Sequence, residues 1–364
     1  MFPAKSLCHR PSSRRTPALR TLLVAACAAW LLAACSSTPK PNAALATPAN
    51  AVHATTSGAR GTATGGASTT PPATPPNATP AASGPLVIGI ALGGGAARGF
   101  AHIGVIKALE AHGIFPQVVA GTSAGSVVGA LYASGMTGIQ MNRLALTLDE
   151  ASIGDWALPF RSRGFLKGVA LQNFVDTTLH HQPIEKMRRT LGIVATDLQS
   201  GQPILFQRGD TGLAVRASCS VPSLFEPVRI GGRDYVDGGL VSPVPAAFAR
   251  RMGANFVIAV DISSNPNGQG TANQFDMLMQ TFTIMGQTIK AYEQDKYADI
   301  VIRPDLAGFG GGDFTQRNAA ILAGEEAVEK IMPVLQAKLA AARAAHPSTA
   351  ARAAAATGRA APAM

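Results

Sequence analysis

A serine between two glycines is the first feature of this sequence that could carry chemistry. Residues 121–125 read Gly-Thr-Ser-Ala-Gly, so that Ser123 has Gly121 and Gly125 two positions away on either side. This pattern is typical of a sharp strand-to-helix turn that exposes the serine hydroxyl, and the glycines let neighbouring backbone approach closely. Residues 118–120 predict a short strand, and small residues after Ser123 predict a helix. We therefore predict that Ser123 is a nucleophile.

A glycine-rich loop precedes this motif in the chain. Residues 93–99, Gly-Gly-Gly-Ala-Ala-Arg-Gly, separate a predicted strand at 86–92 from a predicted helix at 100–112. A dinucleotide-binding loop would need an acidic residue about 20 positions on, and no Asp or Glu lies between residues 111 and 148. The remaining interpretation is an oxyanion hole, in which backbone N–H groups stabilise the oxygen of a tetrahedral intermediate. We assign Gly93, Gly94, Gly95 and Arg98 to this hole.

Asp237 is the candidate base for the serine. It begins the segment Asp237-Gly238-Gly239, which follows a polar hairpin sequence at 231–234. A serine nucleophile needs a group that accepts its proton, and a nearby carboxylate can serve. We predict a dyad in which Ser123 attacks and Asp237 takes the proton.

The histidines offer the alternative base. In α/β-hydrolases the chain order is Ser, then Asp or Glu, then His, but the only histidine after Asp237 is His346, in an Ala-rich tail. His102 falls in the predicted helix after the glycine loop, and we expect it to be structural. His180 and His181 precede Pro183 in a segment, 149–183, that is hard to interpret. They stay open as a second source of a base.

Taken in order, the three motifs resemble those of the bacterial patatin-like phospholipase family. The resemblance covers about residues 86–332, including Ala-Ser-Cys-Ser-Val-Pro at 217–222 and Pro-Val-Pro at 243–245. It implies a three-layer α/β fold, with a central, mostly parallel sheet covered by helices on both faces. It also implies an acyl-enzyme on Ser123, a base at Asp237 that later activates water, and no metal, cofactor or histidine base. One departure is Arg98 in the sixth place of the glycine motif, where it either fixes the loop or meets an anionic head group.

Alternating strands and helices independently predict an α/β domain. Besides the segments above, we expect strands at 191–195, 204–206, 256–260 and 300–302, and helices at 212–219, 244–252, 275–296 and 315–332. Alternation of this kind favours a parallel or mixed sheet covered on both faces. The 364-residue chain is 47% hydrophobic, enough for a sizeable core.

The net charge of +10 lies in the two ends of the chain. Residues 85–335 hold 20 basic groups against all 21 acids of the chain. The main support for nucleic-acid binding by the body of the protein is therefore absent, and we predict none. The sequence points to no particular protein partner.

The N-terminus resembles a bacterial lipoprotein signal. A basic segment up to Arg20 precedes an apolar run at 21–34, too short for a membrane span, which ends in Leu-Ala-Ala before Cys35. An ordinary secretory signal with a chance cysteine is the alternative. We expect a signal peptide at 1–34, a lipidated Cys35 followed by a flexible Pro/Ala/Thr/Ser-rich tether to residue 84, a catalytic domain at 85–335 and an Ala/Arg-rich tail at 336–364. No intrachain disulfide is expected after cleavage.

Together these features predict a lipid acyl hydrolase that uses a Ser–Asp dyad. It would be anchored to the bacterial cell envelope through Cys35, at the outer membrane and facing the periplasm, with membrane lipid as its substrate. One alternative is a non-catalytic envelope lipoprotein that binds lipid or a protein. Another is an esterase or thioesterase that acts on substrates other than phospholipids.

Overall fold

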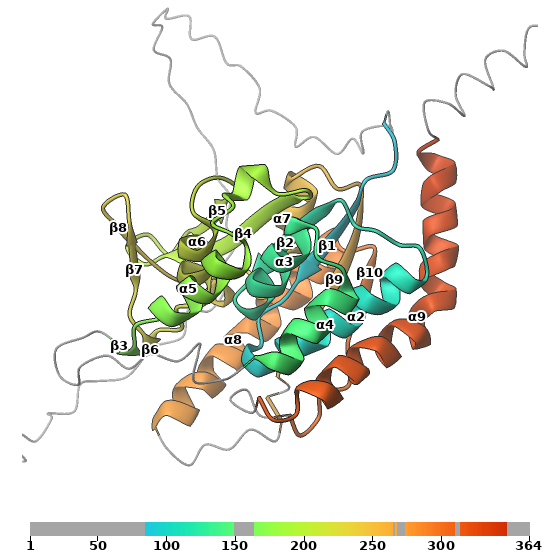
Figure 1. Cartoon of the computed structure of the whole chain (residues 1–364). Helices are drawn as coiled ribbons and strands as arrows, with labels where there is room; N and C mark the ends of the chain where they lie inside the picture. The colour runs from blue at the N-terminus through green and yellow to red at the C-terminus, as the bar shows by residue number, and fades with distance from the viewer. Residues whose placement is uncertain (1–83, 149–163, 265, 268–273, 310–313, 348–364) are drawn as a thin grey trace, which may run out of the picture. The chain divides into compact units, whose positions relative to one another are not determined.

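An eight-stranded sheet forms the centre of the protein (Figure 1). The computed structural model describes residues 84–148, 164–264, 266–267, 274–309 and 314–347; the predicted signal, Cys35 and the tether up to residue 83 lie outside them. The strand order is β10-β9-β1-β2-β4-β8-β7, with β5 paired to β4. The strands are β1 (Ile88–Leu92), β2 (Val118–Thr122), β4 (Thr190–Asp197), β5 (Pro203–Phe206), β7 (Val228–Ile230), β8 (Arg233–Asp237), β9 (Phe256–Val260) and β10 (Ile300–Ile302).

Five neighbouring strands of this sheet, from β10 to β4, run parallel, whereas β5, β8 and β7 join as antiparallel strands. A separate two-stranded sheet pairs β3 (Gly164–Leu166) with β6 (Ser223–Phe225). The parallel part places the carboxyl ends of β1, β2 and β9 at one edge, where the loops that follow them meet. The glycine loop directly follows the end of β1, and Ser123 directly follows the end of β2.

Helices cover both faces of the sheet. They are α2 (Phe100–Ala111), α3 (Ala124–Ser134), α4 (Gly138–Thr147), α5 (Val169–Thr178), α6 (Thr211–Ser218), α7 (Ala246–Arg251), α8 (Gln274–Tyr297) and α9 (Arg317–Ala345). Large side chains of β1, such as Ile90, pack with α2, α3 and α9 on one face. The other face of the same strand carries Ala91, which packs with α7. The predicted three-layer fold with a mostly parallel sheet is confirmed.

The C-terminal helix is longer than the sequence predicted. The helix predicted at 315–332 continues to Ala345, so its predicted end is too early. Residues 336–345 of the Ala/Arg-rich tail extend this helix, which is one of the two outcomes that their composition allows. Pro333 stands inside the helix, where proline normally costs about 3 kcal/mol. The buried side chains of Met332, Leu335 and Leu339 continue the apolar stripe beyond it, and their packing against the core outweighs the local preference.

Two helices lie where none was predicted. Helix α5 falls in the segment that was hard to interpret, and α4 begins at the N-cap Thr137, whose hydroxyl accepts a hydrogen bond from the Gln140 N–H. Thr-x-x-Gln is a capping-box pattern that could have revealed α4 from the sequence. Within the described residues, no helix combines the length and the apolar character needed to cross a membrane.

Candidate active site

Ser123 lies on a sharp turn between β2 and α3, as predicted. Its backbone has φ 52° and ψ −126°, a conformation that residues other than glycine rarely adopt. The flanking glycines are needed for close packing: a Cβ at Gly125 would lie 2.0 Å from the Leu92 carbonyl oxygen, and one at Gly121 would lie 2.5 Å from that of Gly125. The surrounding backbone therefore imposes this turn on Ser123.

A buried serine on α6, Ser218, binds the backbone of Ser123. The Ser123 N–H donates a 2.8 Å hydrogen bond to Ser218 Oγ, and the Ser218 hydroxyl donates a 2.6 Å bond to the carbonyl of Val194 on β4. Sequence reasoning did not single out Ser218 as functional, although it stands in the 217–222 segment that contributed to the family resemblance.

Asp237 ends β8 and is buried. Its N–H donates to the Ser220 carbonyl over 2.9 Å, and its own carbonyl accepts from the Thr196 hydroxyl over 2.8 Å. Its side-chain Oδ1 accepts a 2.7 Å bond from the Gly239 N–H. A Cβ at Gly238 would lie 2.3 Å from the Val194 carbonyl oxygen, so the backbone after the aspartate has no room for a side chain. These contacts fix the carboxylate in one place.

The Asp237 carboxylate interacts with Ser123. Burial raises the pKa of Asp237 to about 6, while the Ser123 hydroxyl and the Gly239 N–H lower it. Among the described residues, no donor meets the distance and angle criteria for a hydrogen bond to the buried Asp237 Oδ2. Contacts of catalytic groups are often loose before substrate binds. The structure thus brings the two predicted dyad residues together and leaves one carboxylate oxygen able to take a proton.

The glycine loop lies against Ser123, but the N–H groups that it leaves unpaired within the described part of the chain differ from those predicted. The Gly93 N–H donates to the carbonyl of Val260 over 3.0 Å, and the Gly94 N–H donates to that of Pro243 over 2.9 Å. These two groups are occupied by the fold, so the prediction that they stabilise an oxyanion is corrected. A Cβ at Gly94 would come within 3.2 Å of Ser123 Cβ, which shows how closely the loop approaches.

The N–H groups of Gly95 and Ala96 donate to no acceptor among the residues described here. Ala96 has a φ of 51°. Ala124, directly after Ser123, starts helix α3, and its N–H is likewise unpaired within the described ranges. Gly95 therefore stays a candidate donor, and Ala96 and Ala124 join it. The glycine pattern alone does not reveal which N–H groups neighbouring loops will occupy.

Arg98 holds the loop. Its Nε and its backbone N–H both donate to the Gly95 carbonyl, over 3.3 and 3.2 Å. Burial lowers the pKa of the Arg98 guanidinium, while the charge of Asp261 raises it. This geometry favours fixing the loop over meeting an anionic head group. Because the Arg98 N–H and Nε both donate to Gly95, the prediction that Arg98 contributes a donor to the oxyanion hole is corrected as well.

His102 is structural, as expected. Its Nε2 lies 2.8 Å from the Gly93 carbonyl oxygen, and because a carbonyl only accepts, Nε2 carries the hydrogen and donates. Burial lowers the pKa of His102 to about 4, so it is neutral at physiological pH. His180 and His181 follow the end of α5, and the His346 ring lies 3.3 Å from the Gly84 carbonyl. In the described part of the chain, no contact joins these three histidines to the Ser123–Asp237 pair.

Cys219 is a third polar neighbour of Ser123. Its Sγ lies 3.8 Å from Ser126 Oγ, whose hydroxyl donates a 2.7 Å bond to the Ser123 carbonyl. Burial and the charge of Asp237 raise the pKa of the Cys219 thiol, while Ser126 and Ser123 lower it. These effects favour the protonated thiol, which is the less nucleophilic form of cysteine.

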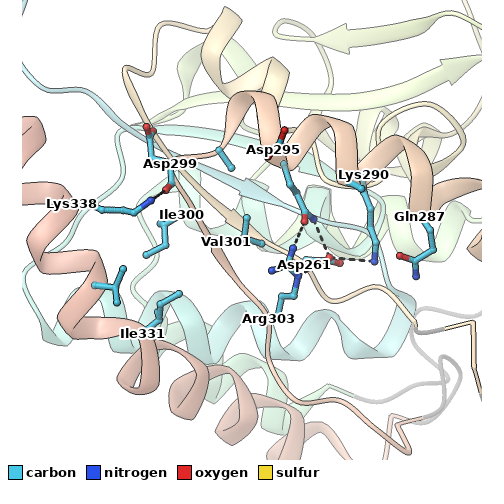
Figure 2. Close-up of a pocket in the computed structure, with 14 residues that line it drawn as sticks. Asp261, Gln287, Lys290, Asp295, Asp299, Ile300, Val301, Arg303, Ile331 and Lys338 are labelled. Carbon is cyan, nitrogen blue, oxygen red and sulfur yellow. Dashed lines mark hydrogen bonds and ion pairs between the residues drawn. The ribbon is translucent and has the colours of Figure 1, made fainter.

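A cavity of about 630 Å³ lies elsewhere, over β10 between α8 and α9 (Figure 2). Its lining includes Asp261, Lys290, Arg303 and Lys338, but neither Ser123 nor Asp237. No group of three His, Cys, Asp or Glu side chains that could hold a metal ion occurs among the described residues.

Comparisons with known proteins agree with the motifs. The family model described as patatin-like phospholipase matches residues 90–250. An uncharacterized NTE family protein of Mycobacterium tuberculosis is 35% identical over 182 residues, which are 50% of this chain and 50% of that protein. Mouse patatin-like phospholipase domain-containing protein 6 is 31% identical over 228 residues, 60% of this chain and 16% of that protein.

The chain thus spans about half the length, or less, of these relatives. Among solved structures, VipD from Legionella pneumophila aligns with a TM-score of 0.46 and 13% identity, over 69% of this chain and 67% of that one. The matched family residues contain both the Ser123 turn and the Asp237 motif. Residues 90–250 of the chain therefore resemble the patatin-like phospholipase family, the family that the motifs around Ser123 and Asp237 also suggest.

Proposed function

We propose that this protein is a lipid acyl hydrolase that cleaves carboxylic esters of phospholipids or lysophospholipids with a Ser123–Asp237 dyad. The observation that carries the proposal is the pairing of these two residues. The serine lies on a strained turn, and the aspartate beside it is buried with a pKa raised to about 6. Such a carboxylate is ionised at neutral pH yet basic enough to accept a proton from a serine in the transition state.

In the first half of the reaction, Ser123 Oγ forms a bond to the ester carbonyl carbon while its proton passes to Asp237 Oδ2. The carbonyl oxygen becomes an oxyanion, which accepts hydrogen bonds from the N–H groups of Gly95, Ala96 or Ala124. Each such donor is worth about 3–4 kcal/mol in the transition state. When the intermediate collapses, the bond to the alcohol breaks, the alcohol leaves with the proton from Asp237, and an acyl-Ser123 remains.

Water completes the cycle. Asp237 takes a proton from a water molecule while the water oxygen forms a bond to the acyl carbon. Collapse of this second tetrahedral intermediate then breaks the bond between the acyl carbon and Ser123 Oγ. The serine recovers its proton from Asp237, and the fatty acid is released. The same carboxylate therefore serves both halves, and no second base is needed.

We also propose that lipidated Cys35 keeps this activity at the bacterial envelope. The support is the sequence before Cys35, together with the tether that would separate the catalytic domain from the anchor. Metabolic labelling with a clickable palmitate tests it. Cys35→Ala should lose the label, and a label that persists in this variant would contradict lipidation at this cysteine.

The catalytic proposal is tested by fatty-acid release from phosphatidylethanolamine and lysophosphatidylethanolamine vesicles, with p-nitrophenyl butyrate as a water-soluble ester. We expect the wild type to release fatty acid, and Ser123→Ala and Asp237→Asn to lose at least about 10³-fold in rate. Hydrolysis of p-nitrophenyl butyrate alone would favour a non-phospholipid esterase. Hydrolysis that survives both substitutions unchanged would overturn the dyad.

A further inference from the structure

Helix α8 presents three polar side chains to the segments that support the active site. Lys290, Glu293 and Gln294 are spaced i, i+3 and i+4, and so share one face of the helix. Glu293 and Gln294 are buried, and the Lys290 side chain is only 13% exposed. Burying polar groups costs free energy unless they are well paired, which makes their partners informative.

The partner of Glu293 is Ser242. The two carboxyl oxygens lie 2.9 and 2.7 Å from Ser242 Oγ, and Ser242 is itself buried. No Lys or Arg forms an ion pair with Glu293 within the described ranges. Burial raises the pKa of Glu293 to about 7, while the Ser242 hydroxyl lowers it. Among the residues described, the hydrogen bond with the Ser242 hydroxyl is therefore the interaction that holds the Glu293 carboxyl group.

Ser242 and the next residue, Pro243, connect all three motifs. The hydroxyl of Thr122, the residue before the nucleophile, donates to the Ser242 carbonyl over 2.9 Å. The N–H of Gly94 donates to the Pro243 carbonyl over 2.9 Å, and the Ser242 N–H donates to the carbonyl of Gly238 over 2.9 Å. A shift of this short segment would move the nucleophile turn, the glycine loop and the aspartate motif against one another.

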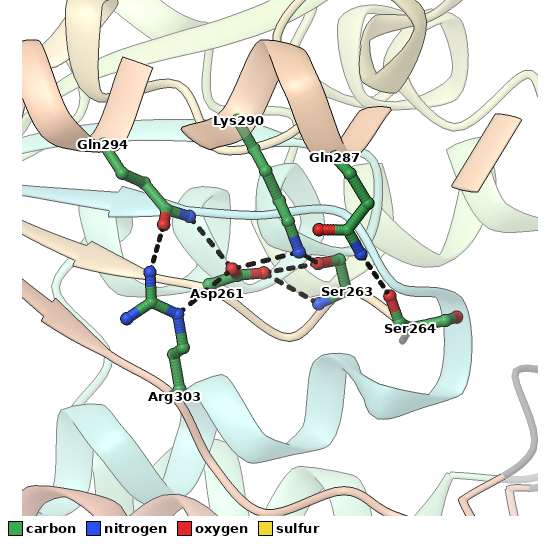
Figure 3. A network of polar contacts seen from close by, with 7 residues as sticks. All are labelled: Asp261, Ser263, Ser264, Gln287, Lys290, Gln294 and Arg303. Carbon is green, nitrogen blue, oxygen red and sulfur yellow. Dashed lines mark hydrogen bonds and ion pairs between the residues drawn. The ribbon is translucent and has the colours of Figure 1, made fainter. Parts of the chain in front are cut away.

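The other two side chains on this face of α8 bind Asp261 (Figure 3). Gln294 Nε2 donates to Asp261 Oδ2 over 3.0 Å, and Lys290 Nζ pairs with the same oxygen over 3.3 Å. Asp261 follows Val260, whose carbonyl accepts the hydrogen bond from the Gly93 N–H. One helix face therefore supports two segments, at Val260 and at Pro243, that accept hydrogen bonds from the glycine loop.

From these contacts, and resting on the proposed function, we propose that Glu293 is a positioning residue for catalysis. By holding Ser242, it fixes the segment on which the Ser123 turn, the Asp237 motif and the glycine loop meet. Glu293 touches no reacting atom; it sets the distance between the groups that do.

A double variant compared with the wild type distinguishes a positioning role of Glu293 from a role in packing alone. Glu293→Leu alone leaves a buried hydroxyl unpaired, so it is combined with Ser242→Ala, because replacing both partners by apolar groups can be nearly neutral for stability. We expect the double variant to fold with an unfolding midpoint close to that of the wild type, but with kcat about 10- to 100-fold lower and KM little changed. Wild-type kcat in the folded double variant would overturn the proposal.

Two further variants complete the set. Glu293→Gln keeps an oxygen that accepts from the Ser242 hydroxyl, and should retain kcat within about threefold of the wild type. If kcat falls as far in Glu293→Gln as in the double variant, the hydrogen bond between residue 293 and Ser242 is not what positions the catalytic groups, and the proposal is overturned. Asp295→Ala, which removes an exposed carboxylate from the same helix, is the matched control and should leave kcat unchanged.

Hydrogen exchange provides a readout that does not depend on hydrolysis. In the full chain, peptides covering residues 93–99 and 118–125 should exchange faster in the double variant than in the wild type or in Asp295→Ala. Unchanged exchange in both peptides would overturn the positioning role. A wild type that hydrolyses no ester would refute the proposed function, and the exchange comparison would still decide whether Glu293 holds these loops.

Discussion

Ser218 Oγ accepts a 2.8 Å hydrogen bond from the backbone N–H of Ser123, and so ties the proposed nucleophile to helix α6. The Ser218 hydroxyl donates in turn to the Val194 carbonyl, the same oxygen that would meet a Cβ at Gly238, next to Asp237. A single buried hydroxyl therefore links the turn that carries the serine to the strand beside the aspartate.

Removing this hydroxyl should weaken both the fold and the reaction. Ser218→Ala leaves the Ser123 N–H and the Val194 carbonyl without their partner, which should lower the free energy of unfolding by about 1–3 kcal/mol. We expect kcat to fall further than stability alone explains, because the strained turn loses a restraint. Urea denaturation and ester hydrolysis measure the two effects. Ser134→Ala, whose hydroxyl donates within α3 to Leu131, is the control; an equally small effect on kcat in both variants would contradict this role.

The rate of hydrolysis should follow the ionisation of Asp237. Only the carboxylate form can accept the serine proton, and the pKa of Asp237 is raised to about 6 by burial. We therefore expect kcat/KM to fall as pH drops through about 6, because this parameter reports the free enzyme. Hydrolysis of p-nitrophenyl butyrate over a pH series measures this acidic fall in kcat/KM. A rate that stays constant from pH 7.5 to pH 4.5 would rule out a base with this pKa.

Asp237 should destabilise the fold at neutral pH. Its folded pKa of about 6 lies above the ordinary value of 3.8, so the folded state holds the proton more tightly and the wild type loses stability as pH rises from 3.8 to 6. Asp237→Asn removes this cost. Its stability advantage over the wild type should grow by about 1–2 kcal/mol between pH 5 and pH 7.5. Urea unfolding at the two pH values tests the sign, and an advantage that shrinks with rising pH would contradict it.

His102 should make the fold less stable as pH falls, which is opposite to the effect of Asp237. Its folded pKa of about 4 lies below the ordinary value of 6.5, so the unfolded state binds the extra proton and the fold loses stability as pH drops from 6.5 to 4. At pH 5 this loss amounts to about 2 kcal/mol. His102→Gln, which can still donate to the Gly93 carbonyl, should lose less stability than the wild type between pH 7.5 and pH 5. It should also remain active, whereas inactivation as complete as in Ser123→Ala would assign His102 a catalytic role.

The sequence revealed the residues that carry strong local signals. Strands such as β9, apolar and β-branched, were predicted at their observed bounds, and the motifs around Ser123 and Asp237 identified two residues that the fold brings together. Glycine spacing identified the turn at Ser123, because a Cβ at Gly125 would clash with the Leu92 carbonyl oxygen.

What the sequence could not reveal depends on long-range contacts. Gly93 and Gly94 look equivalent to Gly95 in the motif, but their N–H groups bond to Val260 and Pro243, which lie more than 140 positions further along the chain. Glu293 has no motif of its own, since it acquires its partner only when α8 packs beside Ser242. The same holds for α9, where packing of Leu339 outweighs Pro333.

The most direct test of the account is covalent labelling of the nucleophile. The full-length protein is treated with a fluorophosphonate probe at pH 7.5, and the adduct is located by mass spectrometry, with Ser123→Ala and Asp237→Asn in parallel. The account predicts one adduct, on Ser123, that disappears in Ser123→Ala and forms at least about 100-fold more slowly in Asp237→Asn. An unlabelled Ser123 in folded protein, or labelling at the same rate without the Asp237 carboxylate, would contradict the dyad.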